Sequence, residues 1–257
     1  MSDYRESAEA FARDTAGHEM TVLLDQGLHR HLRFQKPKSG NCWFEIVTWP
    51  GSLAIRGDID GGYIFTRTTD MFEFFRRSGH NDTINPGYWA EKTEGGRDGC
   101  RSYSADRFRQ RVAEYFDAHA EDDAFERAVV KLKELGLDGD NLDALPKAAA
   151  EECARATAAH MKAVREAFDK TIDGFWAEYN VEYEDEARNA LNSFDFYDNP
   201  DDRYDPEKRP DFEFCNTWDW DFKDPGYWFL WCCHAIAWAI RQYDAAKSAD
   251  KAEVAHA

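Results

Sequence analysis

Two groups of side chains in this sequence could do chemistry, and the first consists of histidines and arginines. His29, His31 and Arg33 alternate along one predicted strand, so their side chains share one face of it. Arg56 and Arg67 lie on predicted strands nearby. Such a cluster could hold an anion such as a nucleotide phosphate, because guanidinium groups donate paired hydrogen bonds to phosphate oxygens. The alternative is a set of salt bridges to the many carboxylates of the chain.

The second group is a run of carboxylates and aromatic rings between Glu178 and Asp224. It contains sixteen Asp and Glu against five Lys and Arg, and so holds eleven of the eighteen excess negative charges. This mixture is typical of a surface that binds a basic partner, because charge steers the encounter and rings anchor the complex. The expected contact residues are Asp195, Asp198, Asp201, Asp202, Tyr204, Asp205, Trp218 and Trp220. The alternative is a solvated loop whose rings pack inward while its acids face water.

The net charge of −18 limits the classes of partner. Nucleic acids and anionic membranes attract basic surfaces, so this charge argues against direct binding to either. It favours a basic partner protein. A row of carboxylates on this chain could then mimic nucleic-acid phosphates in a cleft of that partner. The sequence contains no phosphate-binding loop, nucleophile elbow, zinc-protease motif or EF-hand loop. We therefore expect a binding protein rather than an enzyme, with no catalytic residues, cofactor or metal.

The compartment follows from the apolar segments and the cysteines. Met1–Met20 lacks the apolar stretch of a secretion signal. The most apolar window, Tyr227–Ile240, is shorter than the roughly 20 residues needed to cross a bilayer. The six cysteines show no C-x-x-C spacing, so reduced thiols are expected. These features predict a cytoplasmic protein.

The elements that must position these residues are centred on Cys42–Arg77. Pro50-Gly51 and Asp60-Gly61-Gly62 suit tight turns, so this stretch predicts three antiparallel strands in a meander. A short helix at Met71–Arg77 follows, with Asp70 as its cap.

The rest of the chain mainly predicts helices. Apolar spacing predicts two antiparallel helices over residues 104–135, the second beginning at Asp122 or Asp123. It also predicts a long helical stretch over Leu145–Tyr179, which Gly174 would break or kink. The last helix, Tyr227 to about Tyr243, is apolar nearly all round, so we expect it at the centre of the core.

Together these elements predict an α+β fold, in which a small antiparallel β-meander is covered by helices. A helical bundle is inserted into it, and the C-terminal helix is buried. We expect one domain over residues 1–257, with a sheet core at about 20–92 and 210–245 and a helical insertion at about 104–180. Extended segments at Thr21–Leu24 and Leu28–Phe34 complete the sheet.

The sheet region also resembles a known family. The segments that carry the resemblance are Arg30–Pro37, Trp43–Asp58, Tyr63–Arg76 and the closing Cys233–Tyr243. They resemble a family of uncharacterised proteins from bacteriophages and prophages, in which no catalytic residues are established. The resemblance implies a viral accessory protein in the cytoplasm of a bacterial host. Accessory phage proteins of this kind often block host antiviral systems, as anti-CRISPR proteins do.

Two functional hypotheses follow. In the first, a phage-encoded accessory protein binds and inhibits a host defence protein without catalysis, through the acidic aromatic surface and with or without nucleic-acid mimicry. In the second, the face with His29, His31, Arg33, Arg56 and Arg67 binds or hydrolyses a nucleotide or another small-molecule signal.

Overall fold

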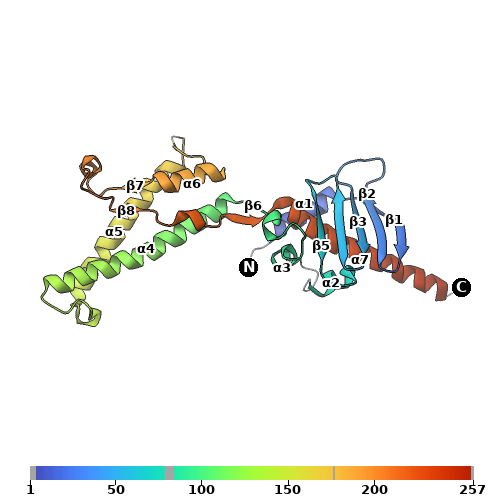
Figure 1. The fold of residues 1–257 in the computed structure, drawn as a ribbon, viewed down its shortest axis with the longest axis horizontal. Helices are drawn as coiled ribbons and strands as arrows, with labels where there is room; N and C mark the ends of the chain where they lie inside the picture. The colour runs from blue at the N-terminus through green and yellow to red at the C-terminus, as the bar shows by residue number, and fades with distance from the viewer. Residues whose placement is uncertain (1–3, 79–83, 176, 256–257) are drawn as a thin grey trace. The chain divides into compact units, whose positions relative to one another are not determined.

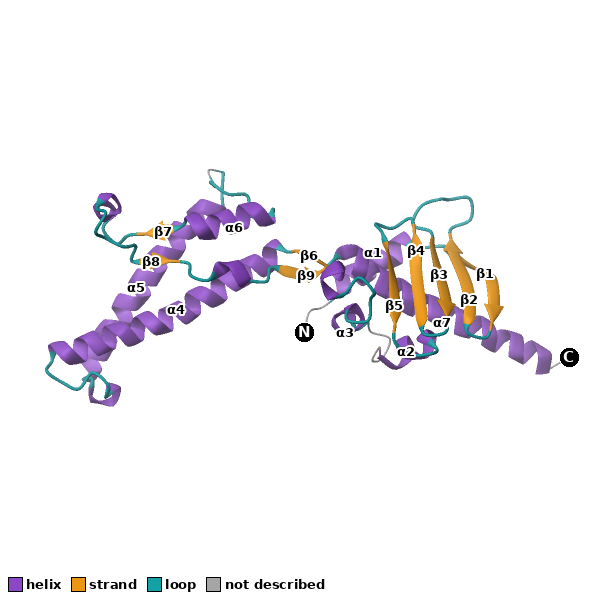
Figure 2. Cartoon of the chain, in the orientation of Figure 1, coloured by secondary structure: helices purple, strands orange, loops and turns teal. Residues whose placement is uncertain are grey.

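The computed structural model describes residues 4–78, 84–175 and 177–255 (Figures 1 and 2). The chain divides into two compact units. Unit 1 consists of the residues up to Ser102 and those from Pro225 onward, and unit 2 is Tyr103–Asp224. Unit 2 is therefore inserted into the chain of unit 1, and it is longer than the helical insertion expected at 104–180. Two short paired strands, β6 (Arg101–Tyr103) and β9 (Lys223–Pro225), lie where the chain leaves unit 1 and returns to it.

Unit 1 is built on an antiparallel meander of five strands that follow one another in chain order across the sheet. The strands are β1 (Glu19–Gln26), β2 (His29–Gln35), β3 (Phe44–Trp49), β4 (Ser52–Gly57) and β5 (Gly62–Thr66). The helices are α1 (Arg5–Asp14), α2 (Met71–Ser78), α3 (Pro86–Ala90), the 3-10 turn η1 (Arg97–Cys100) and α7 (Tyr227–Ala255). This arrangement confirms the expected α+β fold.

The turns and the cap of unit 1 form where the sequence predicts them. Gly51 and Gly61 have φ of 89° and 85°, a region that glycine enters without steric cost. Asp70 caps α2, because its Oδ1 accepts from the backbone N–H of Phe72 at 2.9 Å. Two nitrogens of Arg30 donate to the same carboxylate, both at 3.0 Å. The start of α2 is thereby tied to β2.

The core of unit 1 lies between one face of the sheet and its helices. Leu32, Phe34, Phe44 and Ile46 alternate along β2 and β3 and are fully buried. Figure 1 shows α7 running along the sheet. The α7 side chains with no exposed surface are Phe229, Trp231, Cys232, Cys233, Ala235, Ile236 and Ala239. The last helix is therefore central, as its composition predicts.

Unit 2 is built on a long helical hairpin. Its elements are α4 (Ala105–Glu134), the 3-10 turn η2 (Leu142–Ala144), α5 (Lys147–Ile172), α6 (Glu184–Ser193), β7 (Asp195–Phe196), the 3-10 turn η3 (Pro200–Tyr204), β8 (Phe212–Glu213) and the 3-10 turn η4 (Thr217–Asp219). The returning segment, residues 194–224, follows α6 and leads back to unit 1. The core of unit 2 contains Phe108 and Phe116 from α4, Phe168 from α5, and Phe212 and Phe222 from the returning segment. Aromatic rings thus hold the two long helices against the segment that follows them.

The prediction of two helices over residues 104–135 is wrong, because α4 runs unbroken through Asp122 and Asp123. No Gly or Pro interrupts Ala105–Glu134. The carboxylate of Asp123, expected as a cap, instead accepts from Arg127 at 2.7 Å and from Thr157 of α5 at 2.8 Å. The long helix expected over Leu145–Tyr179 is also shorter, since α5 ends at Ile172, two residues before Gly174.

Within the three described ranges, none of the helices combines the length and the apolar character that crossing a membrane requires.

Candidate functional site

Unit 2 carries nearly all of the excess negative charge. It holds 32 Asp and Glu against 16 Lys and Arg, whereas unit 1 holds 18 against 16. Sixteen of the eighteen excess charges therefore belong to unit 2. The acidic character of the chain is therefore a property of the inserted unit. A negative field attracts cations and basic proteins.

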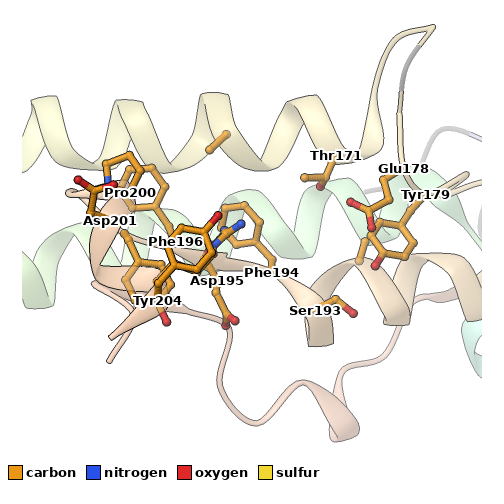
Figure 3. A pocket seen from close by; sticks show the side chains of 14 residues that line it. Thr171, Glu178, Tyr179, Ser193, Phe194, Asp195, Phe196, Pro200, Asp201 and Tyr204 are labelled. Atoms are coloured by element: carbon orange, nitrogen blue, oxygen red, sulfur yellow. Dashed lines mark hydrogen bonds between the residues drawn. The ribbon is translucent and has the colours of Figure 1, made fainter. Parts of the chain in front are cut away.

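A cleft of about 870 Å³ opens in unit 2 beside α5, α6 and the segment from β7 to η3 (Figure 3). Five aromatic residues line it: Tyr179, Phe194, Phe196, Tyr197 and Tyr204. Charged residues lining it are Glu178, Asp195, Asp201 and Arg203. The cleft therefore combines ring faces with an excess of carboxylates.

Local structure explains how the segment from β7 to η3 presents these residues. Phe194 is buried against Phe168 of α5, with ring centroids 5.1 Å apart. The next residue, Asp195, is exposed, since successive side chains of an extended segment point to opposite sides. The side chain of Asn199 then accepts from the backbone N–H of Asp201 at 3.3 Å and starts η3.

The turn after α5 brings Glu178 and Tyr179 to the cleft. Gly174 has φ of 98°, a conformation that ends the helix and suits glycine. The backbone N–H of Tyr179 donates to the carbonyl of Thr171 at 3.0 Å, so the chain folds back on the end of α5. The sequence prediction extended the helical stretch to Tyr179, with Gly174 as the residue that would break or kink it, and assigned Tyr179 no role in a site.

Three carboxylates of the cleft form no ion pair within the described residues. In the part of the chain that the structure describes, no Lys, Arg or His forms an ion pair with Glu178, Asp195 or Asp201. Their negative charge is therefore not neutralised locally. Carboxylates beside ring faces suit a cation, because rings attract cations to their faces and carboxylates accept charge-assisted hydrogen bonds.

One cation, Arg203, already lies in the cleft. Its guanidinium carbon is 5.8 Å from the centroid of the Tyr197 ring. Its Nη2 donates to the backbone carbonyl of Asp195 at 3.0 Å. The guanidinium thus contacts one ring and one backbone carbonyl rather than a carboxylate of the cleft. No sequence pattern indicated this role of Arg203.

The structure brings only part of the predicted contact surface to the cleft. Asp195, Asp201 and Tyr204 line it, and Tyr204 is 84% exposed. Trp218 is 80% exposed on η4 but does not line the cleft. Trp220 has to be removed from the contact surface, because it is only 6% exposed and packs in the core of unit 2.

The other predicted aspartates are engaged within unit 2. Oδ1 of Asp198 lies 3.0 Å from Nδ1 of His160, whose side chain is buried. Asp202 lies 3.6 Å from Nζ of Lys208. The side chain of Asp205 accepts from a backbone N–H two residues further on, at 3.0 Å. These three carboxylates are therefore engaged by groups of unit 2 itself.

In unit 1, part of the predicted anion-binding face forms a salt-bridge cluster around Glu45. Nη1 of Arg33 donates to Oε1 at 2.8 Å, Nε of Arg56 donates to Oε2 at 3.0 Å, and Nε2 of His31 lies 3.3 Å from Oε2. The Arg33 guanidinium also stacks over Trp43 at 4.3 Å. Burial would raise the pKa of Glu45, but Arg56, His31 and Arg33 outweigh it and hold the pKa below its usual value.

The remaining two members of the predicted anion set lie outside this cluster. His29 is exposed at the start of β2. Arg67 follows β5, where its backbone N–H donates to the carbonyl of Gly51 at 3.2 Å. Gly51 directly precedes β4 and Arg56 lies near the end of that strand, about 16 Å away at roughly 3.3 Å per residue. The geometry thus matches the salt-bridge alternative rather than a five-residue anion site.

Groups that could bind a metal or act as nucleophiles give no second site. Within the described ranges, no three His, Cys, Asp or Glu side chains are grouped to hold a metal ion. All six cysteines are free thiols. Burial raises the pKa of Cys232 and Cys233, so both stay protonated and unreactive in the core.

Neither a protein-family model nor a curated protein nor a solved structure matches this chain.

Proposed function

We propose that this protein is a non-enzymatic binding protein, and that the cleft of unit 2 and the surface around it bind a basic partner protein. The observation that carries the proposal is that Glu178, Asp195 and Asp201, among the rings of the cleft, form no ion pair with any described Lys, Arg or His. The net charge of unit 2 would speed the encounter with a basic surface, and the rings would supply contact area after docking.

Two exposed rings of unit 2 support the same proposal. Tyr204 and Trp218 are 84% and 80% exposed. Aromatic side chains of this kind are enriched among the residues that dominate binding energy, because they bury a large area when a partner covers them. Tyr204 would anchor the partner at the cleft, and Trp218 would contact it farther along the returning segment.

The resemblance to phage proteins extends the proposal to a class of partner. In a phage context, the partner would be a protein of the bacterial host, and binding would inhibit a defence system. A host protein that handles nucleic acid offers a basic groove, which suits carboxylates acting in place of phosphates. Localisation in the host cytoplasm belongs to the same proposal.

Affinity capture from a nuclease-treated bacterial lysate tests the proposal. The wild-type chain should retain a basic protein in stoichiometric amount. The double variant Asp195→Lys, Asp201→Lys should retain less than about a tenth of it, because repulsion replaces attraction at the contact. The control Asp140→Lys, Asp143→Lys reverses the same charge near η2 and should retain the protein normally. Equal retention by both variants, or none by the wild type, would contradict the proposal.

A thermal-shift screen with mono-, di- and cyclic nucleotides checks the second hypothesis. Under the present proposal no nucleotide stabilises the protein. A ligand at 100 times its Kd would add about 2.7 kcal/mol to the free energy of unfolding. Stabilisation that Arg56→Ala removes would assign function to the sheet face of unit 1 instead.

A further inference from the structure

We infer that the cleft of unit 2 recognises an arginine side chain of the partner, and that Arg203 occupies this place in the free protein. The inference rests on the proposed function. It adds that the group recognised is a guanidinium, and that Arg203 of this chain competes with it for the cleft.

The lining of the cleft is suited to a flat organic cation. Phe196, Tyr197 and Tyr204 supply ring faces, and Asp195 and Asp201 supply carboxylates. Figure 3 shows Asp195, Phe196, Asp201 and Tyr204 grouped at one end of the cleft. A guanidinium can stack on a ring with its face and donate hydrogen bonds to carboxylates with its edge. A lysine ammonium offers no flat face, so this lining favours arginine over lysine.

Arg203 shows that the cleft accepts a guanidinium. It lies near the Tyr197 ring, 5.8 Å from its centroid, and donates to the carbonyl of Asp195 at 3.0 Å. Among the described residues it forms no ion pair with a carboxylate, although Asp195 and Asp201 line the same cleft. Arg203 therefore contacts a ring and a backbone carbonyl, and it does not bond to the carboxylates, which are the stronger acceptors.

The contacts of Arg203 are weak enough to be exchanged. Its side chain is exposed, and an exposed guanidinium near a ring contributes only a small free energy because water competes for it. An incoming arginine that reaches the carboxylates gains charge-assisted hydrogen bonds that Arg203 does not make. The volume of about 870 Å³ lies within the usual range for ligand sites, so the cleft is large enough for an inserted side chain.

Titration calorimetry with two probe peptides, hexa-arginine and hexa-lysine, tests the inference at about 150 mM salt, where long-range attraction is screened. The wild-type chain should bind hexa-arginine about threefold or more tighter than hexa-lysine. The variant Asp195→Asn, Asp201→Asn should weaken hexa-arginine binding about tenfold and remove the preference. The control Asp140→Asn, Asp143→Asn loses the same charge outside the cleft and should keep the preference.

Arg203→Ala gives the sharper test. It should tighten hexa-arginine binding about three- to tenfold, because no internal guanidinium has to leave the cleft. Removing a positive charge also increases general attraction, so the matched control is Arg209→Ala, an exposed arginine that does not line the cleft. That control should tighten binding less than about twofold, since an exposed charge outside the site acts weakly at this salt concentration.

Equal binding of the two peptides by the wild type would overturn the inference. So would an Arg203→Ala variant that binds no tighter than Arg209→Ala, with melting temperatures showing that both fold. If lysate capture succeeds while these tests fail, the proposed function stands and the partner is held by other chemistry. If the peptide results are as expected but nothing is captured, the arginine site stands and the proposal of a host protein falls.

Discussion

Arg33 on β2 and Glu45 on β3 are direct cross-strand neighbours, and Nη1 of Arg33 donates to Oε1 of Glu45 at 2.8 Å. Arg56 on β4 is the neighbour of Glu45 on its other side. Glu45 is only 3% exposed, so one buried carboxylate joins three strands through two arginines. Cross-strand pairs of opposite charge stabilise a sheet, and this one also satisfies a buried charge.

Replacing Glu45 by Gln should lower the free energy of unfolding by about 1–2 kcal/mol at pH 7, because the hydrogen bonds lose their charged acceptor. Arg33 and Arg56 retain access to water, so the loss should stay below that of a fully buried ion pair. Urea denaturation measures the change. Glu9→Gln, an exposed control on α1, should change stability by less than about 0.5 kcal/mol. Equal effects of the two variants would contradict this role of Glu45.

The contribution of Glu45 should also depend on pH. Its pKa is lowered in the folded chain from the usual 4.5, so folding favours the ionised carboxylate. The stabilisation is fully present above the unfolded value and is lost as the pH falls through the lower folded value. The difference in unfolding free energy between wild type and Glu45→Gln should therefore be constant from pH 7 to about 5 and shrink below 4.5. A difference that grows on acidification would reverse the expected sign.

Trp231→Ala should destabilise unit 1 by about 3–5 kcal/mol. Trp231 is fully buried on α7, its ring lies 5.1 Å from Phe11 and 5.5 Å from Phe44, and its Nε1 donates to Asp14 at 3.0 Å. The variant leaves a cavity and an acceptor without its donor. Chemical denaturation followed by circular dichroism gives the change, and a loss below about 1 kcal/mol would mean that α7 is not central.

Trp220 and Trp218 should behave oppositely although only Asp219 lies between them. Trp220→Ala should destabilise unit 2 by about 3–5 kcal/mol, because the ring is buried 5.0 Å from Tyr115 and below Arg111. Trp218→Ala should change stability by less than about 0.5 kcal/mol, because its side chain faces water. Melting curves of the two variants check this. Comparable losses would contradict the assignment of one ring to the core and the other to the surface.

Reversing Asp195 and Asp201 to Lys should act on the rate of association with a basic partner. The two exposed carboxylates add to the field that attracts a basic surface, so the on-rate should fall and lose much of its dependence on salt between about 50 and 300 mM. Tyr204→Ala should instead raise the off-rate and cost more than about 2 kcal/mol of binding if the ring is an anchor. Surface plasmon resonance with the captured partner separates the two effects. An on-rate indifferent to the charge reversal would remove the acidic surface from the mechanism.

The turns, the sheet and the buried last helix could be predicted because their signals are local. Proline and glycine at residues 50–51 suit a tight turn in any context, and the alternation around Leu32 follows from the geometry of a strand. The continuity of α4 through Asp123 could not be predicted in this way. A carboxylate can cap a helix or bond to a neighbouring helix, and the presence of Thr157 on α5 decided which.

By itself the sequence determined the α+β fold, the central place of α7 and the concentration of acidic and aromatic residues before it. Only the tertiary structure decided which of these residues are available to a partner. Asp198 meets His160 and Trp220 enters the core, whereas Asp195, Asp201 and Tyr204 line the cleft. The physical reason is that composition and spacing report on the local conformation of residues that are close together along the chain. The pairing of a carboxylate or the burial of a ring depends on groups that folding brings from far away in the sequence.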